Sequence, residues 1–252
     1  MLVIGLDAAS QWKNFGYAVG DYTDTQIQIL EAGLIESDGE SDVLENRIAP
    51  QLRKSNRALV AIDAPLGWPQ PLADALANHR AGERITIAKN ALFRRRTDLL
   101  VARTSGKTPL EIGADRIARA AHAALDALNH LREASGKPIP LIWNKDFSGL
   151  GAIEVYPGAT LKARNLKYVG YKKPDQLGVR RQIAQELRSD IPMLVKFVRQ
   201  KADVFDACLC LVAAKDFLDG FAAPPEDPSL AQKEGWIWVR GISGDIRTKS
   251  ER

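Results

Sequence analysis

Short apolar segments separated by turn residues occupy the first part of the chain. Three of them, at 1–8, 14–21 and 26–35, run apolar or alternate with polar residues. Gly, Asp and Thr lie between them, which predicts a three-stranded antiparallel meander. The segment SDVLENRIAPQLRK at 41–54 starts with a Ser-Asp cap and has near-helical apolar spacing, so it predicts a helix that Pro50 kinks or ends. ALVAID at 58–63 predicts a fourth strand.

The order meander, helix, strand restricts how the fourth strand can pair. A strand that returns to the sheet through a helical crossover pairs most naturally in parallel with an earlier strand. If its partner is the first strand, Asp7 and Asp63 lie side by side at the carboxyl ends of two neighbouring strands. That edge is the usual binding edge of an open α/β sheet.

The rest of the chain is mainly helical. We predict helices throughout 69–137, including a long one at 114–134, and further helices at 176–188 and 202–220. Strand character returns at 141–143 and in GAIEVYP at 151–157, and GWIWVRG at 235–241 predicts a short final strand. We expect one domain over 1–243, with a helical insertion at about 69–137 and a polar, flexible tail at 244–252.

Composition narrows the class of protein. The 252 residues are 45% hydrophobic, which is enough for a sizeable core, and no apolar stretch is long enough to span a membrane. The N-terminus enters strand-like sequence without a basic leader, so we expect a cytoplasmic protein with no membrane partner. Its two cysteines, Cys208 and Cys210, point to different helix faces and form neither a disulfide nor a metal pair. Any metal would need oxygen ligands.

Positive charge is unevenly distributed, although the net charge is only +4. Residues 80–119 carry ten Lys or Arg against four acids, and residues 157–188 carry eight against two. Two basic segments in an otherwise acidic chain favour a polyanionic ligand such as nucleic acid. The alternative is that these are solvated helix faces.

Carboxylates end several apolar elements. Asp7, Asp63 and Glu154 each follow an apolar strand, and Asp206 lies on a very apolar helix with Asp203 on the same face. A buried carboxylate without a partner is costly, so a compensating positive group is expected. Each residue alone could instead cap a turn or, for Asp203, a helix N-terminus. A shared cause is the better explanation for several such coincidences.

Divalent cations provide that cause. Mg²⁺ and Mn²⁺ prefer oxygen ligands, and pairs of such ions form the catalytic clamp of many phosphodiester-cleaving enzymes. A clamp of this kind needs three or four carboxylates from separate elements. Asp7, Asp63, Glu154 and Asp206 supply that number, and we expect them to be metal ligands and catalytic residues, with Asp203 secondary.

This layout resembles the RNase H-like fold, and the stretch DVFDA at 203–207 is similar to the last-helix motif of RuvC-type Holliday-junction resolvases. The sequence more closely resembles domain-of-unknown-function family 429, described as predicted RNase H-like nucleases. The matching stretches lie in order along most of the chain: VIGLDAA, AIDAPLGWP, RRRTDLLVAR, AIEVYPGAT, GYKKPD with Arg180 and Arg181 after it, DVFDA and EGWIWV. The resemblance implies a five-stranded mixed sheet flanked by helices and metal-dependent hydrolysis of nucleic acid. One departure is that only Glu45 could match the first-helix glutamate of RNase H, which favours the resolvase-like set of acids.

Further residues are candidates for substrate binding. In RRRTDLLVAR these are Arg96, Asp98 and Arg103, because arginine can contact phosphate through two hydrogen bonds. Lys172 and Lys173 could reach the scissile phosphate or its flank. Among the tryptophans, Trp68 follows a predicted ligand and could stack on a base. The alternatives are surface charge on a helix, a solvated loop and a core aromatic residue, respectively.

Three functions are compatible with these features. The first is a Mg²⁺- or Mn²⁺-dependent nuclease that acts on DNA or RNA by a two-metal mechanism. The second is a non-catalytic module that binds nucleic acid or a protein partner. The third is an actin-like ATP-dependent kinase, which requires a glycine-rich turn after the first strand. Asp7 is followed by Ala-Ala-Ser-Gln-Trp, so the third is disfavoured.

Overall fold

A five-stranded mixed sheet forms the centre of the protein. The computed structural model describes residues 1–23, 25–35, 43–113 and 115–241, so the predicted tail at 244–252 lies outside the described residues. The strands are β1 (Leu2–Asp7), β2 (Gly16–Tyr22), β3 (Ile27–Leu34), β4 (Arg57–Asp63) and β5 (Gly149–Glu154). Their order is β3-β2-β1-β4-β5, with β1, β2 and β3 antiparallel and β1, β4 and β5 parallel. This confirms the predicted meander and the parallel crossover of an RNase H-like sheet.

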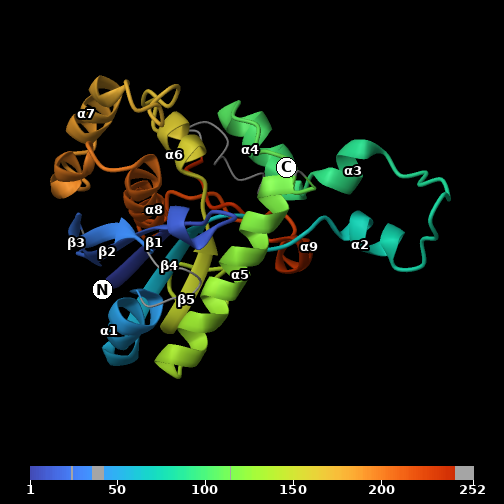
Figure 1. The fold of residues 1–252 in the computed structure, drawn as a ribbon, viewed down its shortest axis with the longest axis horizontal. Coiled ribbons are helices and arrows are strands. Elements are labelled where there is room, and N and C mark those ends of the chain that lie inside the picture. Colours follow the sequence, from blue (N-terminus) through green and yellow to red (C-terminus); the bar gives the residue numbers. More distant parts are fainter. Residues whose placement is uncertain (24, 36–42, 114, 242–252) are drawn as a thin grey trace, which may run out of the picture.

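Helices cover both faces of this sheet (Figure 1). Val3, Leu59 and Ile153 pack with the core of α8 (Ala202–Leu218) and α7 (Leu177–Glu186) on one face. On the other face the alternate strand residues, such as Ile4 and Val60, pack with α1 (Ala49–Lys54) and α5 (Asp115–Ser135). Because successive strand side chains point to opposite faces, fully apolar strands are what a sheet covered on both sides requires.

The helical region after β4 has two parts. α2 (Gln70–Leu76) and α3 (Lys89–Phe93) extend away from the sheet together with the segment between them, whereas the long α5 runs along it (Figure 1). The buried stripe of α5, which includes Ala124, Leu128 and Leu131, packs in the same core as the sheet. α4 (Arg96–Ser105) lies between α3 and α5 in the sequence, and it contacts α6 (Pro157–Ala163) and α9 (Pro228–Glu234).

Two local predictions need correction. The segment predicted as a helix at 41–54 consists, where it is described, of a π-helical turn (Leu44–Ile48) followed by α1, with Pro50 in the first turn of α1. The helical backbone runs without a break through 43–54, so Pro50 does not end the helix. The segment 235–241 forms isolated bridges, Ile237 with Glu154 and Arg240 with Ala222, instead of a continuous strand.

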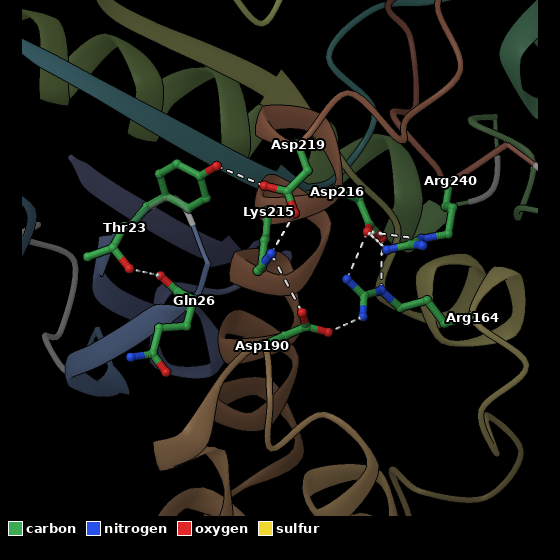
Figure 2. A network of polar contacts seen from close by, with 9 residues as sticks. Thr23, Gln26, Arg164, Asp190, Lys215, Asp216, Asp219 and Arg240 are labelled. Atoms are coloured by element: carbon green, nitrogen blue, oxygen red, sulfur yellow. Dashed lines mark hydrogen bonds and ion pairs between the residues drawn. The ribbon is translucent and has the colours of Figure 1, made fainter.

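A network of charged side chains fixes the C-terminal half of α8 (Figure 2). Asp216, which is fully buried, accepts hydrogen bonds from Arg164 (3.0 and 2.8 Å) and Arg240. Arg164 also donates to Asp190 at 2.6 Å, and Lys215 pairs with Asp190 and Asp219. Buried charges are stable only when paired in this way. The network therefore ties α8 to the loops around it, well away from Asp203 and Asp206 at the other end of the helix.

Two expectations about chemistry also have an outcome. Cys208 and Cys210 are both buried and free, as predicted. Among the described helices, none combines the length and the apolar character needed to cross a bilayer.

Candidate metal centre

Three aspartates from three elements converge at the carboxyl edge of the parallel strands. Asp7 and Asp63 are direct register partners at the ends of β1 and β4. Asp206 reaches the same point from α8, which packs across β1. One carboxylate oxygen from each residue lies within 4.8 Å of the other two. Within the residues that the structure describes, this is a group able to hold a metal ion.

Two glycines allow α8 to approach the sheet closely enough for this convergence. A Cβ atom on Gly5 of β1 would lie 2.1 Å from the carbonyl oxygen of Ala207, next to Asp206. A Cβ atom on Gly16 of β2 would lie 2.1 Å from the carbonyl oxygen of Asp203. Both contacts are with helix backbone, which cannot turn away. Any larger residue would therefore push the first turns of α8 off the sheet and Asp206 away from Asp7.

The three carboxylates repel one another in a setting that excludes water. Burial raises the pKa of Asp7 well above its ordinary value, and the negative charges of Asp206 and Asp63 raise it further. Burial raises the pKa of Asp63 to about 7, with Lys172 acting in the opposite direction. Burial also raises the pKa of Asp206. One oxygen of Asp206, Oδ2, lies in ion-pair contact with Lys172. The cluster thus needs a cation to be stable in its ionised form.

Lys172 supplies one positive charge to the cluster. Its ammonium group is in ion-pair contact with Asp206, and its charge lowers the pKa of Asp7 and Asp63 as well. The side chain remains 57% exposed, so it reaches the acids from the solvent side. Arg180, which is buried, fixes this loop by donating to the carbonyl oxygens of Tyr171 and Lys172 at 2.6 and 3.3 Å. Arg180 therefore holds the backbone of Lys172 beside the cluster.

Glu154 lies beside the cluster without joining it. Its carboxylate accepts two hydrogen bonds from Arg95, at 2.8 and 2.7 Å, and one from the backbone N–H of Leu66 at 3.0 Å. Arg95 also binds Asp98 through two bonds, at 3.2 and 2.9 Å, and all three side chains are buried. This node holds the turn after Asp63 against α4. Asp98, predicted to bind substrate, is one of its members and is not at the surface.

The other predicted site residues lie at different distances from the aspartates. Asp203 is one helical turn before Asp206, and its charge raises the pKa of Asp7 and Asp206. Arg96 and Arg103 are exposed and pair with Glu226, and Lys173 is exposed in the loop next to Lys172. Trp68 lines a separate hollow with Gln70 and Lys233. The structure therefore brings Asp203 and Lys172 to the cluster, but not Arg96, Arg103 or Trp68.

Sequence reasoning gave no structural role to two arginines that are buried in the fold. Arg95 lies in the same RRR run as Arg96, and Arg180 stands next to Arg181. Their sequence neighbours are similar, so composition alone could not separate the buried member from the exposed one. One available signal was Asp98, three residues after Arg95, since an acid at that position completes a capping box at the start of α4.

A cavity of about 270 Å³ opens beside the aspartates. Asp7, Asp63, Glu154 and Lys172 provide its charged side. Its apolar lining includes Pro109, Leu110 and Ile117, and Tyr156 also faces it. Leu110 is 67% exposed, so this apolar side is open to a ligand. An apolar lining with a few charged groups is the usual composition of a ligand site.

A protein-family comparison places the chain. Residues 5–229 match the family described as Protein of unknown function (DUF429). The chain belongs to the DUF429 family. This DUF429 protein is also similar in structure to RuvC from T. thermophilus, solved in complex with a Holliday junction substrate. That match has 13% sequence identity and a TM-score of 0.33, and covers 89% of this chain and 99% of RuvC. No curated protein sequence matches the chain.

Proposed function

We propose that this DUF429 protein is a divalent-metal-dependent nuclease that hydrolyses phosphodiester bonds of DNA or RNA, with Mg²⁺ or Mn²⁺ as its cofactor. The observation that carries the proposal is the convergence of Asp7, Asp63 and Asp206 from three separate elements to within 4.8 Å. Hard divalent cations prefer such oxygen ligands, and enzymes that cleave phosphodiesters use them.

The residues present fit a divalent ion. Asp206 is fully buried, and the positive group in ion-pair contact with it is the ammonium of Lys172. Burial and mutual repulsion raise the pKa of all three aspartates, so they form a site that is short of positive charge. Lys172 offsets only part of this negative charge. A divalent cation would bind the carboxylate oxygens and neutralise the cluster.

Each side chain then has a distinct task. Asp7, Asp63 and Asp206 would bind the metal, which when bound supplies an activated water and stabilises the leaving oxygen. Lys172, whose side chain is 57% exposed, would leave Asp206 and contact the phosphate of the substrate. The cavity beside the aspartates would admit the nucleotide, with Tyr156 in its wall. The Arg95–Glu154 pair would hold the turn that carries Asp63.

A two-metal mechanism needs a further carboxylate. Asp203 is the better candidate because it lies one turn from Asp206 and acts electrostatically on Asp7. Glu154 could serve only if its two hydrogen bonds with Arg95 opened. We therefore assign Asp203 to the second ion ahead of Glu154.

The test is a cleavage assay with labelled single-stranded and duplex DNA and RNA in the presence of Mn²⁺. We expect cleavage by the wild-type protein and a loss of at least about a hundredfold in Asp63→Asn, because the asparagine removes one metal ligand. Asp146→Asn, an exposed aspartate in another hollow, is the matched control and should cleave normally. Cleavage that survives Asp63→Asn, or its absence on every substrate, would contradict the proposal.

One observation favours a second candidate, a non-catalytic module that binds nucleic acid or a partner. Lys172 already pairs with Asp206 and could stabilise the cluster without a metal. Such a module would bind nucleic acid equally well with Mn²⁺ and with EDTA, and would never cleave it. Titration of a labelled oligonucleotide under both conditions separates the two functions.

A further inference from the structure

Two tyrosines and two lysines, each partly exposed, lie near one another beside the cavity at the aspartates. We call this surface the tyrosine–lysine strip; it consists of Tyr156, Lys107, Tyr168 and Lys162. Lys107 follows the end of α4, Tyr156 and Lys162 lie at the two ends of α6, and Tyr168 is in the loop after α6; α4 and α6 contact each other (Figure 1). None of these residues belongs to the predicted catalytic set.

The members of the strip are adjacent in a defined order. Tyr156 lines the cavity together with Asp63. A Cβ atom built on Gly158 would lie 3.4 Å from the Tyr156 ring and 3.5 Å from Cε of Lys107, so these two side chains pass over the same point. The ammonium groups of Lys107 and Lys162 lie 5.7 and 5.0 Å from the ring centre of Tyr168. The strip thus runs from the acid cluster outward, with aromatic rings and cations alternating.

The two lysines are not neutralised by neighbouring acids. Among the described residues, no carboxylate forms an ion pair with Lys107 or Lys162. By contrast, the exposed Arg96 and Arg103 of the same region both pair with Glu226. Lys162 instead donates to the carbonyl oxygen of Gly106 at 2.7 Å, which ties α6 to the end of α4. The strip therefore offers positive charge that remains free for an external anion.

We propose that the tyrosine–lysine strip binds single-stranded nucleic acid, with the lysines contacting phosphates and the tyrosine rings stacking on unpaired bases. Rings spaced between cations favour a single strand, because the bases of a duplex already stack on one another and present no free face. The inference rests on the proposed function only for the direction of the strand, toward the aspartates.

The test measures binding in EDTA, where no cleavage can occur. Fluorescein-labelled 20-nucleotide oligo-dT and oligo-rU are titrated with each protein by fluorescence anisotropy at several NaCl concentrations. We expect Tyr168→Ala to weaken binding about 5- to 100-fold and Tyr168→Phe to leave it nearly unchanged, since phenylalanine keeps the ring. Lys107→Ala combined with Lys162→Ala should reduce the slope of log K against log salt by about 1.4, or about 0.7 for each lysine. Lys196→Ala, an exposed lysine in the turn Pro192–Phe197, is the control and should bind within about twofold of wild type.

Two further arms exclude other occupants. A 20-base-pair duplex should bind more weakly than the single strands and should not respond to Tyr168→Ala. If Tyr168→Ala binds single strands as wild type does, or weakens duplex binding by the same factor, the inference is overturned. It is likewise overturned if only binding to phosphatidylserine vesicles responds to the variants. Circular dichroism and thermal unfolding verify that each variant folds. If the variants lose single-strand binding but the wild-type protein shows no Mn²⁺-dependent cleavage, this inference stands and the nuclease proposal is refuted.

Discussion

Each carboxylate of the aspartate cluster is buried beside other carboxylates, which lowers the stability of the fold when the carboxylates are ionised. Asp7 and Asp63 end buried strands next to Asp206, and burial is the main cause of their raised pKa values. Residues that serve only the stability of a protein are not arranged in this way, because like charges in a dry site oppose folding. Raised pKa values in a cleft are a physical mark of functional groups. Two predictions test this reading of single side chains.

The first prediction concerns pH and stability without metal. The folded pKa of Asp63 is about 7, against 3.8 for an exposed aspartate, so the folded protein keeps a proton that the unfolded chain releases in this window. The free energy of unfolding therefore falls as the pH rises from about 4 to 7. Asp63→Asn should remove part of this fall and be more stable than wild type at pH 7.5 by about 1–2 kcal/mol. Urea unfolding in EDTA at pH 5 and 7.5 measures this; an equal pH dependence in both proteins would contradict it.

The second prediction concerns Lys172. Its ammonium group pairs with Asp206, so a divalent ion on the same carboxylates must displace or repel it. Lys172→Met should bind Mn²⁺ up to about tenfold more tightly, a gain of about 1.4 kcal/mol, yet cleave nucleic acid more slowly because a phosphate contact is lost. Calorimetric titration with Mn²⁺ gives the affinity. Lys173→Met, its exposed neighbour, serves as the control, and weaker Mn²⁺ binding by Lys172→Met would refute this role.

Between neighbouring elements, the distance between backbones decides whether the site can exist. β1 and α8 touch through Gly5, and α4, α9 and the turn after β4 meet at the buried Arg95. Arg95 donates to Glu154, to Asp98 and to the carbonyl oxygen of Glu234. One side chain thus joins three segments that are far apart in sequence. Each contact leads to a prediction with a matched control elsewhere in the chain.

Gly5→Ala should separate α8 from the sheet. The added Cβ would lie 2.1 Å from the backbone oxygen of Ala207, so helix and strand must move apart. We expect a loss of about 1–3 kcal/mol in the free energy of unfolding and weaker Mn²⁺ binding, because Asp206 moves with the helix. Gly178→Ala on α7, where an added Cβ meets nothing within 4 Å, should be neutral or slightly stabilising. Equal effects of the two substitutions would exclude this explanation.

Arg95→Ala and Arg96→Ala form a second matched pair. Arg95 is 1% exposed, and its removal leaves Glu154 buried without its main partner, which should cost about 3–5 kcal/mol. Arg96 is 53% exposed and pairs only at the surface, so its removal should cost less than about 1 kcal/mol. Chemical denaturation of both variants gives the comparison. Similar stabilities would mean that the buried node does not support the fold.

The distribution of charge over the complete fold combines attraction and repulsion for a polyanion. Phosphate is repelled by the aspartate cluster unless a cation is bound there, while the tyrosine–lysine strip attracts it. Both surfaces meet at the cavity that Tyr156, Asp63 and Lys172 line. Metal binding and substrate binding should therefore support each other.

The fifth prediction is that Mn²⁺ stabilises the folded protein. A ligand that binds only the folded state at a hundred times its Kd adds about 2.7 kcal/mol to the free energy of unfolding. Thermal unfolding with increasing Mn²⁺ should show a rising Tm that EDTA reverses, and Asp7→Asn should not respond. An unchanged Tm in the wild-type protein at millimolar Mn²⁺ would count against a metal centre.

Local patterns in the sequence were sufficient for most of the framework. Apolar alternation and turn residues predicted β1 to β5, and the helical crossover predicted that β4 pairs in parallel with an earlier strand, which in the structure is β1. From that pairing alone, Asp7 and Asp63 had to be neighbours, because strands in register share one edge. The DxxD spacing likewise placed Asp203 and Asp206 on one face of α8.

Packing decided which charged residues meet. RRR and RR runs contain buried and exposed arginines that composition does not distinguish, so the burial of Arg95 and Arg180 emerged only from the folded arrangement. Glu154 and Asp63 both end an apolar strand. In the fold, however, Glu154 pairs with Arg95, whereas Lys172 pairs with Asp206. The physical reason is the range of the forces: strand and helix patterns follow from neighbours along the chain, whereas an ion pair depends on distances between elements that only close packing sets.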